Sequence, residues 1–108
     1  METLKKIFGN TTHLKLLLLF YNNDGYFDNI TGLTKQLGKS HVTVRKVVSD
    51  LVSAGILKEL DIGKSRVVMI NTENPCTKAV FQFLNEIKKI EEEKRKRESA
   101  KERLFQMY

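Results

Sequence analysis

The chain has 108 residues, of which 41% are hydrophobic, and its 19 Lys and Arg against 13 Asp and Glu give a formal charge of +6. This size fits one domain with a single core, and the basic excess favours a polyanionic partner such as nucleic acid or an anionic membrane surface. The longest apolar run, 16–21, is far too short for a membrane span of roughly 20 residues, and the first residues lack a secretory signal. We therefore expect a cytoplasmic protein without a membrane partner.

Two helices are predicted before residue 23. Leu4, Ile7 and Phe8 lie on one side of a short helix over 2–8, which Gly9-Asn10 ends. Thr11 or Thr12 then caps a second helix. Its buried face follows from the i, i+3, i+4, i+7 spacing of Leu14, Leu17, Leu18 and Tyr21. A turn at 22–25 and a short edge strand at 26–28 come next.

A helix, a tight turn and a second helix are predicted over 31–54. Thr31 offers a cap for the first helix, which ends at Gly38 with Leu33 and Leu37 facing inward. Ser40 sits at the N-cap position of the second, which runs to about Ala54. The order of these elements is that of a helix-turn-helix.

The second of these helices has a core face and an outward face. At 100° per residue, one side is apolar: Val44, Val47, Val48, Leu51 and Val52. The opposite side carries Val42, Lys46 and Ser49, flanked by Arg45 and Thr43, and begins at a helix N-terminus, where free amides favour a phosphate. Arg45 has the donors to read guanine and Val42 the methyl groups to meet thymine, whereas the plainer interpretation is a solvated helix surface.

A β-hairpin with a basic tip follows. Strand-like runs at 56–61 and 66–71 flank the turn 62–65, where Lys64 and Arg66 are placed to touch phosphate or the minor groove. Lys35 and Lys39 are placed to grip the DNA backbone near the first turn. The complete set of predicted DNA-binding residues is Lys35, Lys39, Ser40, His41, Val42, Thr43, Arg45, Lys46, Ser49, Lys64, Ser65 and Arg66.

A long final helix is predicted from Asn74, which caps it, to Tyr108, with Pro75 at its first position. Its apolar face includes four residues that exceed what a small core easily covers, and we predict that they form a homodimer interface: Phe83, Leu84, Ile87 and Ile90. The alternative is that this face packs on Leu4, Ile7 and the first core helix of its own subunit, and the two arrangements are compatible. Apolar residues return at Leu104, Phe105 and Tyr108 after a charged stretch.

The pattern over 33–57 reads Leu33-x3-Leu37-Gly38-x-Ser40-x2-Thr43-Val44-x2-Val47-Val48-x2-Leu51-x3-Gly55-Ile56-Leu57, followed by the hairpin. With its flanks, 11–71, it resembles the winged helix-turn-helix regulators of prokaryotes, including the MarR-like and ArsR-like families. The resemblance implies a cytoplasmic transcriptional regulator that binds duplex DNA, usually as a homodimer. The cysteine cluster or His/Asp set of metal-sensing ArsR-like members is missing.

The fold class we predict is mainly α with a small β-hairpin (α+β), a winged helix-turn-helix with a long C-terminal helix. Residues 1–73 form the DNA-binding domain with an N-terminal arm, and 74–108 form the dimerisation helix. The function predicted is sequence-specific binding of double-stranded, palindromic DNA, with the helix at about 40–54 in the major groove and the wing at about 56–71 on the backbone or minor groove. A protein-docking module of winged-helix type and a non-specific architectural or partition protein are the alternatives.

The sequence gives little support for nucleotide hydrolysis or metal binding. Gly38-Lys39-Ser40 and Gly63-Lys64-Ser65 lack the upstream glycine of a phosphate-binding loop. His13, His41 and Cys76 have no ligand partners at metal-binding spacing, and Cys76 is the single cysteine. We therefore expect no enzyme activity, no metal site and no cofactor.

Overall fold

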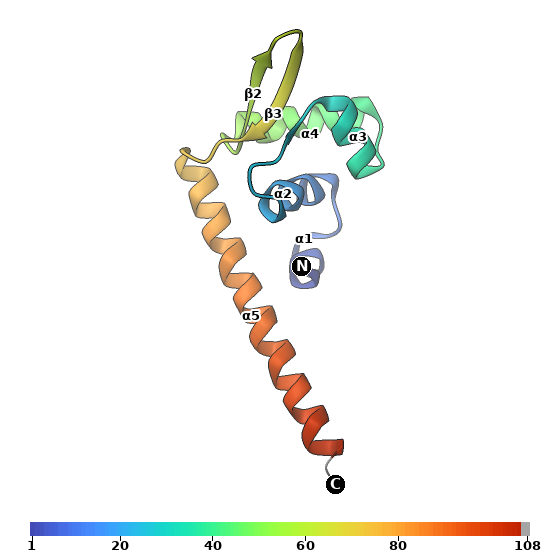
Figure 1. Ribbon diagram of the computed structural model, residues 1–108, viewed down its shortest axis with the longest axis vertical. Helices are drawn as coiled ribbons and strands as arrows, with labels where there is room; N and C mark the ends of the chain where they lie inside the picture. The colour runs from blue at the N-terminus through green and yellow to red at the C-terminus, as the bar shows by residue number, and fades with distance from the viewer. Residues whose placement is uncertain (107–108) are drawn as a thin grey trace.

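The computed structural model describes residues 1–106 and arranges them in five helices and three short strands (Figure 1). In chain order these are α1 (Glu2–Phe8), α2 (Thr12–Asn22), β1 (Phe27–Asp28), α3 (Ile30–Leu37), α4 (His41–Ser53), β2 (Leu57–Ile62), β3 (Ser65–Ile70) and α5 (Pro75–Gln106). The elements predicted from the sequence are all present, and the expectation for Tyr108 lies outside the described residues.

Helices α2, α3 and α4 and the sheet enclose the main core. Its buried members come from each of these elements: Leu16, Phe20, Leu33, Val44, Val47, Val48, Leu57 and Val68. The apolar face predicted for α4 is confirmed, since Val44, Val47 and Val48 are all at most 3% exposed. Burial of these side chains fixes the face that α4 turns to solvent.

The strands form one antiparallel sheet in the order β1-β3-β2. Ile62 pairs with Ser65, so the hairpin closes through the two residues Gly63 and Lys64 and is tighter than the four-residue turn predicted at 62–65. Gly63 has a φ of 61°, a value that an L-residue rarely adopts and that places glycine at the first position of a two-residue hairpin turn. The tighter turn sets the cross-strand pairing of the whole wing.

A second, smaller cluster joins α1, α2 and α5. Leu4, Leu14 and Leu84 are buried in it, and Leu17, Leu18 and Tyr21 pack around them. The face predicted for α2 is therefore the one that meets α1 and α5. That prediction missed the second buried face of α2, which turns Leu16 and Phe20 toward the main core.

Helix α5 leaves the body of the protein as a long projection (Figure 1). Asn74 caps it as predicted, because the Asn74 Oδ1 accepts a 2.8 Å hydrogen bond from the Cys76 amide. Thr77 Oγ1 donates to the carbonyl oxygen of Gly55 at 3.2 Å, which ties the start of α5 to the end of α4. Every residue from 93 to 106 is exposed. None of the helices within residues 1–106 is long and apolar enough to cross a membrane. The architecture is an α+β fold of the winged-helix type with a long C-terminal helix.

Candidate nucleic-acid interface

The turn between α3 and α4 is built by local capping. Asn29 caps α3, because its side chain accepts a 2.8 Å hydrogen bond from the Gly32 amide. The prediction that Thr31 caps this helix is wrong: Thr31 lies inside the first turn, and the asparagine two residues earlier has the extended backbone that an N-cap needs. Gly38 ends α3 in the left-handed conformation, with φ 64° and ψ 36°, as expected for a C-terminal glycine.

The start of α4 is held by two contacts. Ser40 Oγ accepts a hydrogen bond from the Thr43 amide at 3.2 Å, which confirms the predicted cap. His41 Nε2 lies 3.3 Å from Thr31 Oγ1 on α3 and thereby links the two helices. The first turn of α4 is thus fixed in place while its side chains face solvent.

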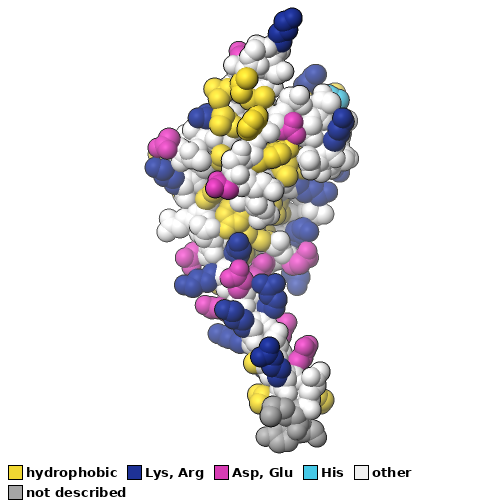
Figure 2. All heavy atoms as spheres, viewed as in Figure 1, with side chains coloured by type: hydrophobic (Ala, Val, Ile, Leu, Met, Phe, Trp, Pro, Cys, Tyr) yellow, Lys and Arg dark blue, Asp and Glu magenta, His cyan; other side chains and the backbone are white. Residues whose placement is uncertain are grey.

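The structure brings the sequence-predicted residues of α3 and α4 to one exposed surface. Val42 is 77% exposed, and the other members of the predicted set on these helices and their turn are exposed as well: Lys35, Lys39, Ser40, His41, Thr43, Arg45, Lys46 and Ser49. Figure 2 shows Lys and Arg side chains on this side of the body and at the tip of the hairpin. Several cations and few acids therefore share the surface that begins at the α4 N-terminus.

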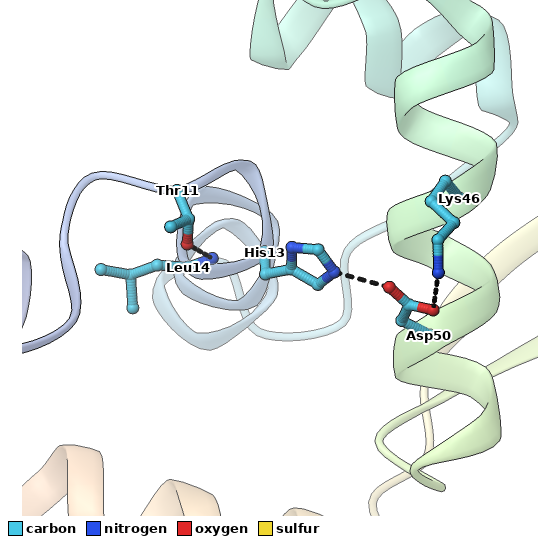
Figure 3. Close-up of polar contacts among 5 residues, drawn as sticks. All are labelled: Thr11, His13, Leu14, Lys46 and Asp50. Atoms are coloured by element: carbon cyan, nitrogen blue, oxygen red, sulfur yellow. Dashed lines mark hydrogen bonds and ion pairs between the residues drawn. The ribbon is translucent and has the colours of Figure 1, made fainter.

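Lys46 is part of a three-residue polar network (Figure 3). Its Nζ lies 2.7 Å from Asp50 Oδ1, and the other oxygen of Asp50 lies 2.7 Å from His13 Nε2 on α2. The hydrogen bond from Lys46, and after it the one from His13, lower the pKa of the Asp50 carboxyl from its ordinary value. Sequence reasoning missed this network, although the i,i+4 spacing of Lys46 and Asp50 on α4 is a signal for their pairing. His13 and Asp50 are 37 positions apart, and no motif connects them.

The wing is less basic than predicted. Arg66 is exposed, but its guanidinium lies 3.3 Å from both Glu59 Oε2 and Asp61 Oδ1. Asp61 is the cross-strand partner of Arg66, and Glu59 lies two residues along the same face of the sheet. The expectation that Arg66 is a free cation is therefore corrected. Lys64 and Ser65 remain exposed at the tip, and Lys64 forms no ion pair with any residue in 1–106.

The residues predicted for dimerisation separate into two groups on α5. Leu84 is 1% exposed and packs against Leu4 and Leu14 of its own chain, as the alternative interpretation held for that residue. Ile87 is half-buried beside them, whereas Phe83 and Ile90 are 43% and 56% exposed. Ile7, which that alternative placed under α5, is 58% exposed. Only part of the predicted face is therefore covered within one chain.

No three His, Cys, Asp or Glu side chains within residues 1–106 come close enough together to hold a metal ion. Cys76 is exposed at the start of α5.

The fold resembles that of solved proteins. No protein-family model and no curated protein matches this chain. A predicted DNA-binding transcriptional regulator from E. coli superposes with a TM-score of 0.51 and 17% identity, over 80% of this chain and 90% of the other. A possible transcriptional regulator from Methanosarcina mazei superposes with a TM-score of 0.52 and 19% identity, over 85% of each chain. At these identities the similarity establishes a shared fold.

Proposed function

We propose that this protein is a transcriptional regulator that binds specific sequences in double-stranded DNA as a homodimer. The observation that carries the proposal is α4: its buried valines fix its orientation, and the capped first turn projects His41, Val42 and Thr43 into solvent beside Arg45. In the proposed complex α4 enters the major groove and the β2–β3 wing lies on the backbone or minor groove. The names given to the two structural neighbours agree with this function, and kinship with MarR-like or ArsR-like regulators is part of the proposal.

Electrostatic capture is the first step of the proposed mechanism. Lys35 and Lys39 lie on the exposed side of α3 and its turn, and Lys64 lies at the hairpin tip. Each cation that neutralises a phosphate releases a counterion, so binding weakens as salt rises. Arg66 contributes less than a free arginine, because it must share its charge between phosphate and its two carboxylate neighbours.

Readout by α4 is the second step. Arg45 presents two parallel donors suited to the O6 and N7 of guanine, and Val42 suits a thymine methyl group. Thr43 and Ser49 have hydroxyls for base edges or phosphates. Lys46 contacts DNA while still paired with Asp50, so its side chain has fewer accessible conformations than that of an unpaired lysine.

Dimerisation completes the proposal. The sequence predicts that residues 1–73 bind DNA and that residues 74–108 form the dimer. We therefore assign dimerisation to the exposed part of α5. Of the four residues predicted for the interface, Phe83 and Ile90 are exposed, and Ile87 lies at the edge of the same stripe. Two recognition helices related by a two-fold axis imply a palindromic operator.

A protein-docking module is the second candidate. The outer face of the sheet exposes Phe27, Leu60 and Ile62 by 55%, 42% and 54%. An apolar face that extends from β1 to β2 suits contact with another protein better than contact with phosphate.

The test is a fluorescence-anisotropy titration of a randomised duplex pool at two salt concentrations, with the bound DNA recovered and sequenced. The expected result is salt-dependent binding and an enriched palindrome. Salt-dependent binding without enrichment indicates an architectural protein, and the absence of binding favours the docking module. Lys96→Ala, which removes a cation from α5 far from α4, is the matched control and should bind as the wild type does.

A further inference from the structure

One stripe of α5 is only partly covered by its own chain. At 100° per residue, α1 and α2 take the sides of α5 that carry Leu84 and Phe81. The remaining side holds Phe83, Ile90 and Leu104, which are 43%, 56% and 59% exposed. Charged residues lie between these three on the same side: Glu86, Glu93, Lys94, Arg97 and Lys101.

The charges on this stripe are ordered along the helix. The half nearer the body carries the acids Glu86 and Glu93, and the half that projects carries the bases Lys94, Arg97 and Lys101. Figure 2 shows Lys, Arg and Glu side chains crowded along the projecting helix. No ion pair within residues 1–106 involves these five side chains. A stripe with one acidic and one basic half complements a second copy of itself only when the two run in opposite directions.

We propose that two copies of the chain pair through this stripe with their α5 helices antiparallel and the two-fold axis between Glu93 and Lys94. This inference rests on the homodimer in the proposed function and adds its orientation and register. In this register Phe83 lies opposite Leu104 of the partner subunit, and Glu86 lies opposite Lys101 of the partner subunit. Glu93 lies opposite Lys94 of the partner subunit, and Ile90 covers the aliphatic stem of Arg97 of the partner subunit.

A parallel pair is disfavoured by the same charges. It would place Lys94, Arg97 and Lys101 each beside its own copy, and like charges that face each other across helices destabilise the pair. In the antiparallel register opposite charges face each other instead, at the Glu86–Lys101 and Glu93–Lys94 positions. Apolar residues face each other at the Phe83–Leu104 position. Ordered charge therefore selects the direction, and apolar burial at both ends supplies the attraction.

The body of each subunit has an apolar groove that can accommodate the end of the partner helix. An apolar groove of about 350 Å³ opens beside Phe83, lined also by Leu4, Phe8 and Leu14. Phe8 packs edge-on against Phe83 with ring centroids 6.4 Å apart, yet Phe8 is still 56% exposed. Phe105, 88% exposed at the far end of α5, reaches this groove in the antiparallel pair. The register that matches the charges thus also places the exposed distal residues on an apolar surface.

Disulfide cross-linking tests the direction, in a Cys76→Ser background that removes the native thiol. Full-length Glu86→Cys and Lys101→Cys proteins are oxidised separately and as a mixture. In the proposed register the two positions meet only across the pair, so we expect a cross-linked dimer in the mixture and little in either protein alone. Two Lys101→Cys positions would then be separated by about 22 Å of helix. Efficient cross-linking of Lys101→Cys alone indicates a parallel pair and overturns the proposal.

Light scattering tests the contribution of the distal end. Leu104→Ser should weaken the dimer by about tenfold or more, because it removes buried apolar surface on both sides of the axis. Gln106→Ser, on the opposite side of the same turn, is the matched control and should leave the dimer unchanged. Equal behaviour of the two variants, or a wild-type monomer, overturns the proposal.

The DNA titration separates this inference from the function on which it rests. If the wild type binds an enriched sequence while Lys101→Cys cross-links to itself, the regulator stands and the antiparallel register fails. If the mixture cross-links as expected but no DNA is bound, the register stands and the DNA-binding function fails.

Discussion

Asp50 determines how Lys46 is presented to a partner. The carboxylate bridges Lys46 on its own helix and His13 on α2, with both distances at 2.7 Å. One acid on an otherwise basic surface weakens phosphate attraction slightly, but it also orders a flexible side chain. At the residue scale the surface is therefore a set of cations held to different degrees, with Arg45 and Lys64 unpaired within residues 1–106, Lys46 singly paired and Arg66 doubly paired.

Arg45→Ala and Lys64→Ala should separate base reading from phosphate contact. Loss of Arg45 is expected to reduce the preference for the selected sequence by about 1 to 3 kcal/mol, because a bidentate base contact is lost. Loss of Lys64 should weaken binding to all sequences alike and reduce the salt slope by about one phosphate. Anisotropy titrations with the selected and a scrambled duplex over a salt series measure both. Identical effects of the two variants on both duplexes would contradict the assigned roles.

Asp50→Asn should make the stability of the protein less dependent on acid pH. The pKa of Asp50 is lowered in the folded state, so its stabilising effect is full above the unfolded pKa of about 3.9 and is lost as pH falls through the folded value. The variant should therefore melt at a lower temperature than the wild type at pH 7, and the difference should shrink as the pH falls below the unfolded pKa of about 3.9. Thermal melts across this range measure it. Asp24→Asn, in the turn after α2, should show no such difference, and a constant gap at all pH values would argue against the network.

Ion pairs that join different elements are not visible in the sequence. The exposure of Arg45, Lys46 and Ser49 was predictable, because the apolar period of α4 fixes its outward face. The Lys46–Asp50 pair follows from its i,i+4 spacing on α4, whereas the His13 partner of Asp50 depends on how α2 crosses α4. The partners of Arg66 depend on the strand register. The surface could thus be predicted from local pattern, but the ion pairs that join different elements could not.

At the scale of the element, some helix boundaries and buried faces could be predicted from the sequence and others could not. Ser40, Gly38 and Asn74 were predictable because each capping residue stands next to a clear apolar period. Both Asn29 and Thr31 are residue types that can cap α3. Asn29 is the N-cap because its backbone is extended, whereas Thr31 is helical. In α2 the spacing of leucines revealed one buried face, and the second was hidden because nearly every residue from 14 to 21 is apolar.

Ser40→Ala should destabilise the protein by about 1 kcal/mol, the usual cost of losing an N-cap. The expected cause is the Thr43 amide, which loses its 3.2 Å acceptor at the start of α4. Urea unfolding at fixed protein concentration measures the change. Ser53→Ala, at the other end of α4, should have a much smaller effect, and equal costs for the two would mean that the cap contributes nothing.

Glu91→Ala should loosen α1. The carboxylate of Glu91 accepts a 2.9 Å hydrogen bond from the Thr3 amide, and this bond is the main reason that its pKa is lowered. Without the acceptor, α1 keeps only its apolar contacts through Leu4 and Phe8, and the amides of 2–8 should exchange with solvent faster. Hydrogen exchange followed by mass spectrometry measures this directly. Glu102→Ala should leave exchange in 2–8 unchanged, and protection of α1 that survives the loss of Glu91 would show that packing alone holds this helix.

The whole molecule is elongated, 64 by 29 by 24 Å, because α5 extends well beyond the body (Figure 1). The length of α5 was predictable, since neither Gly nor Pro interrupts it after Pro75. The packing of α1 on α5 was predicted, as an alternative, through Leu4 and Ile7, and it holds for Leu4, whereas Ile7 and Phe8 stay exposed. A helix that projects this far places any partner bound along it at a distance from α4, and the spacing of DNA half-sites becomes a readout of the dimer.

An antiparallel α5 pair should favour half-sites about two helical turns of DNA apart. In the proposed register the two Pro75 residues are separated by about 55 Å along the pair. Helix α4 is tied to the start of α5 by the Thr77–Gly55 hydrogen bond and lies beyond it in Figure 1, so the two recognition helices are further apart still. One DNA turn, about 34 Å, is too short for this separation, whereas two turns are long enough. The sequences recovered from the randomised pool should therefore contain two inverted half-sites centred about 20 base pairs apart. A spacing of about 10 base pairs would instead require the two bodies to lie side by side, which the antiparallel register does not permit.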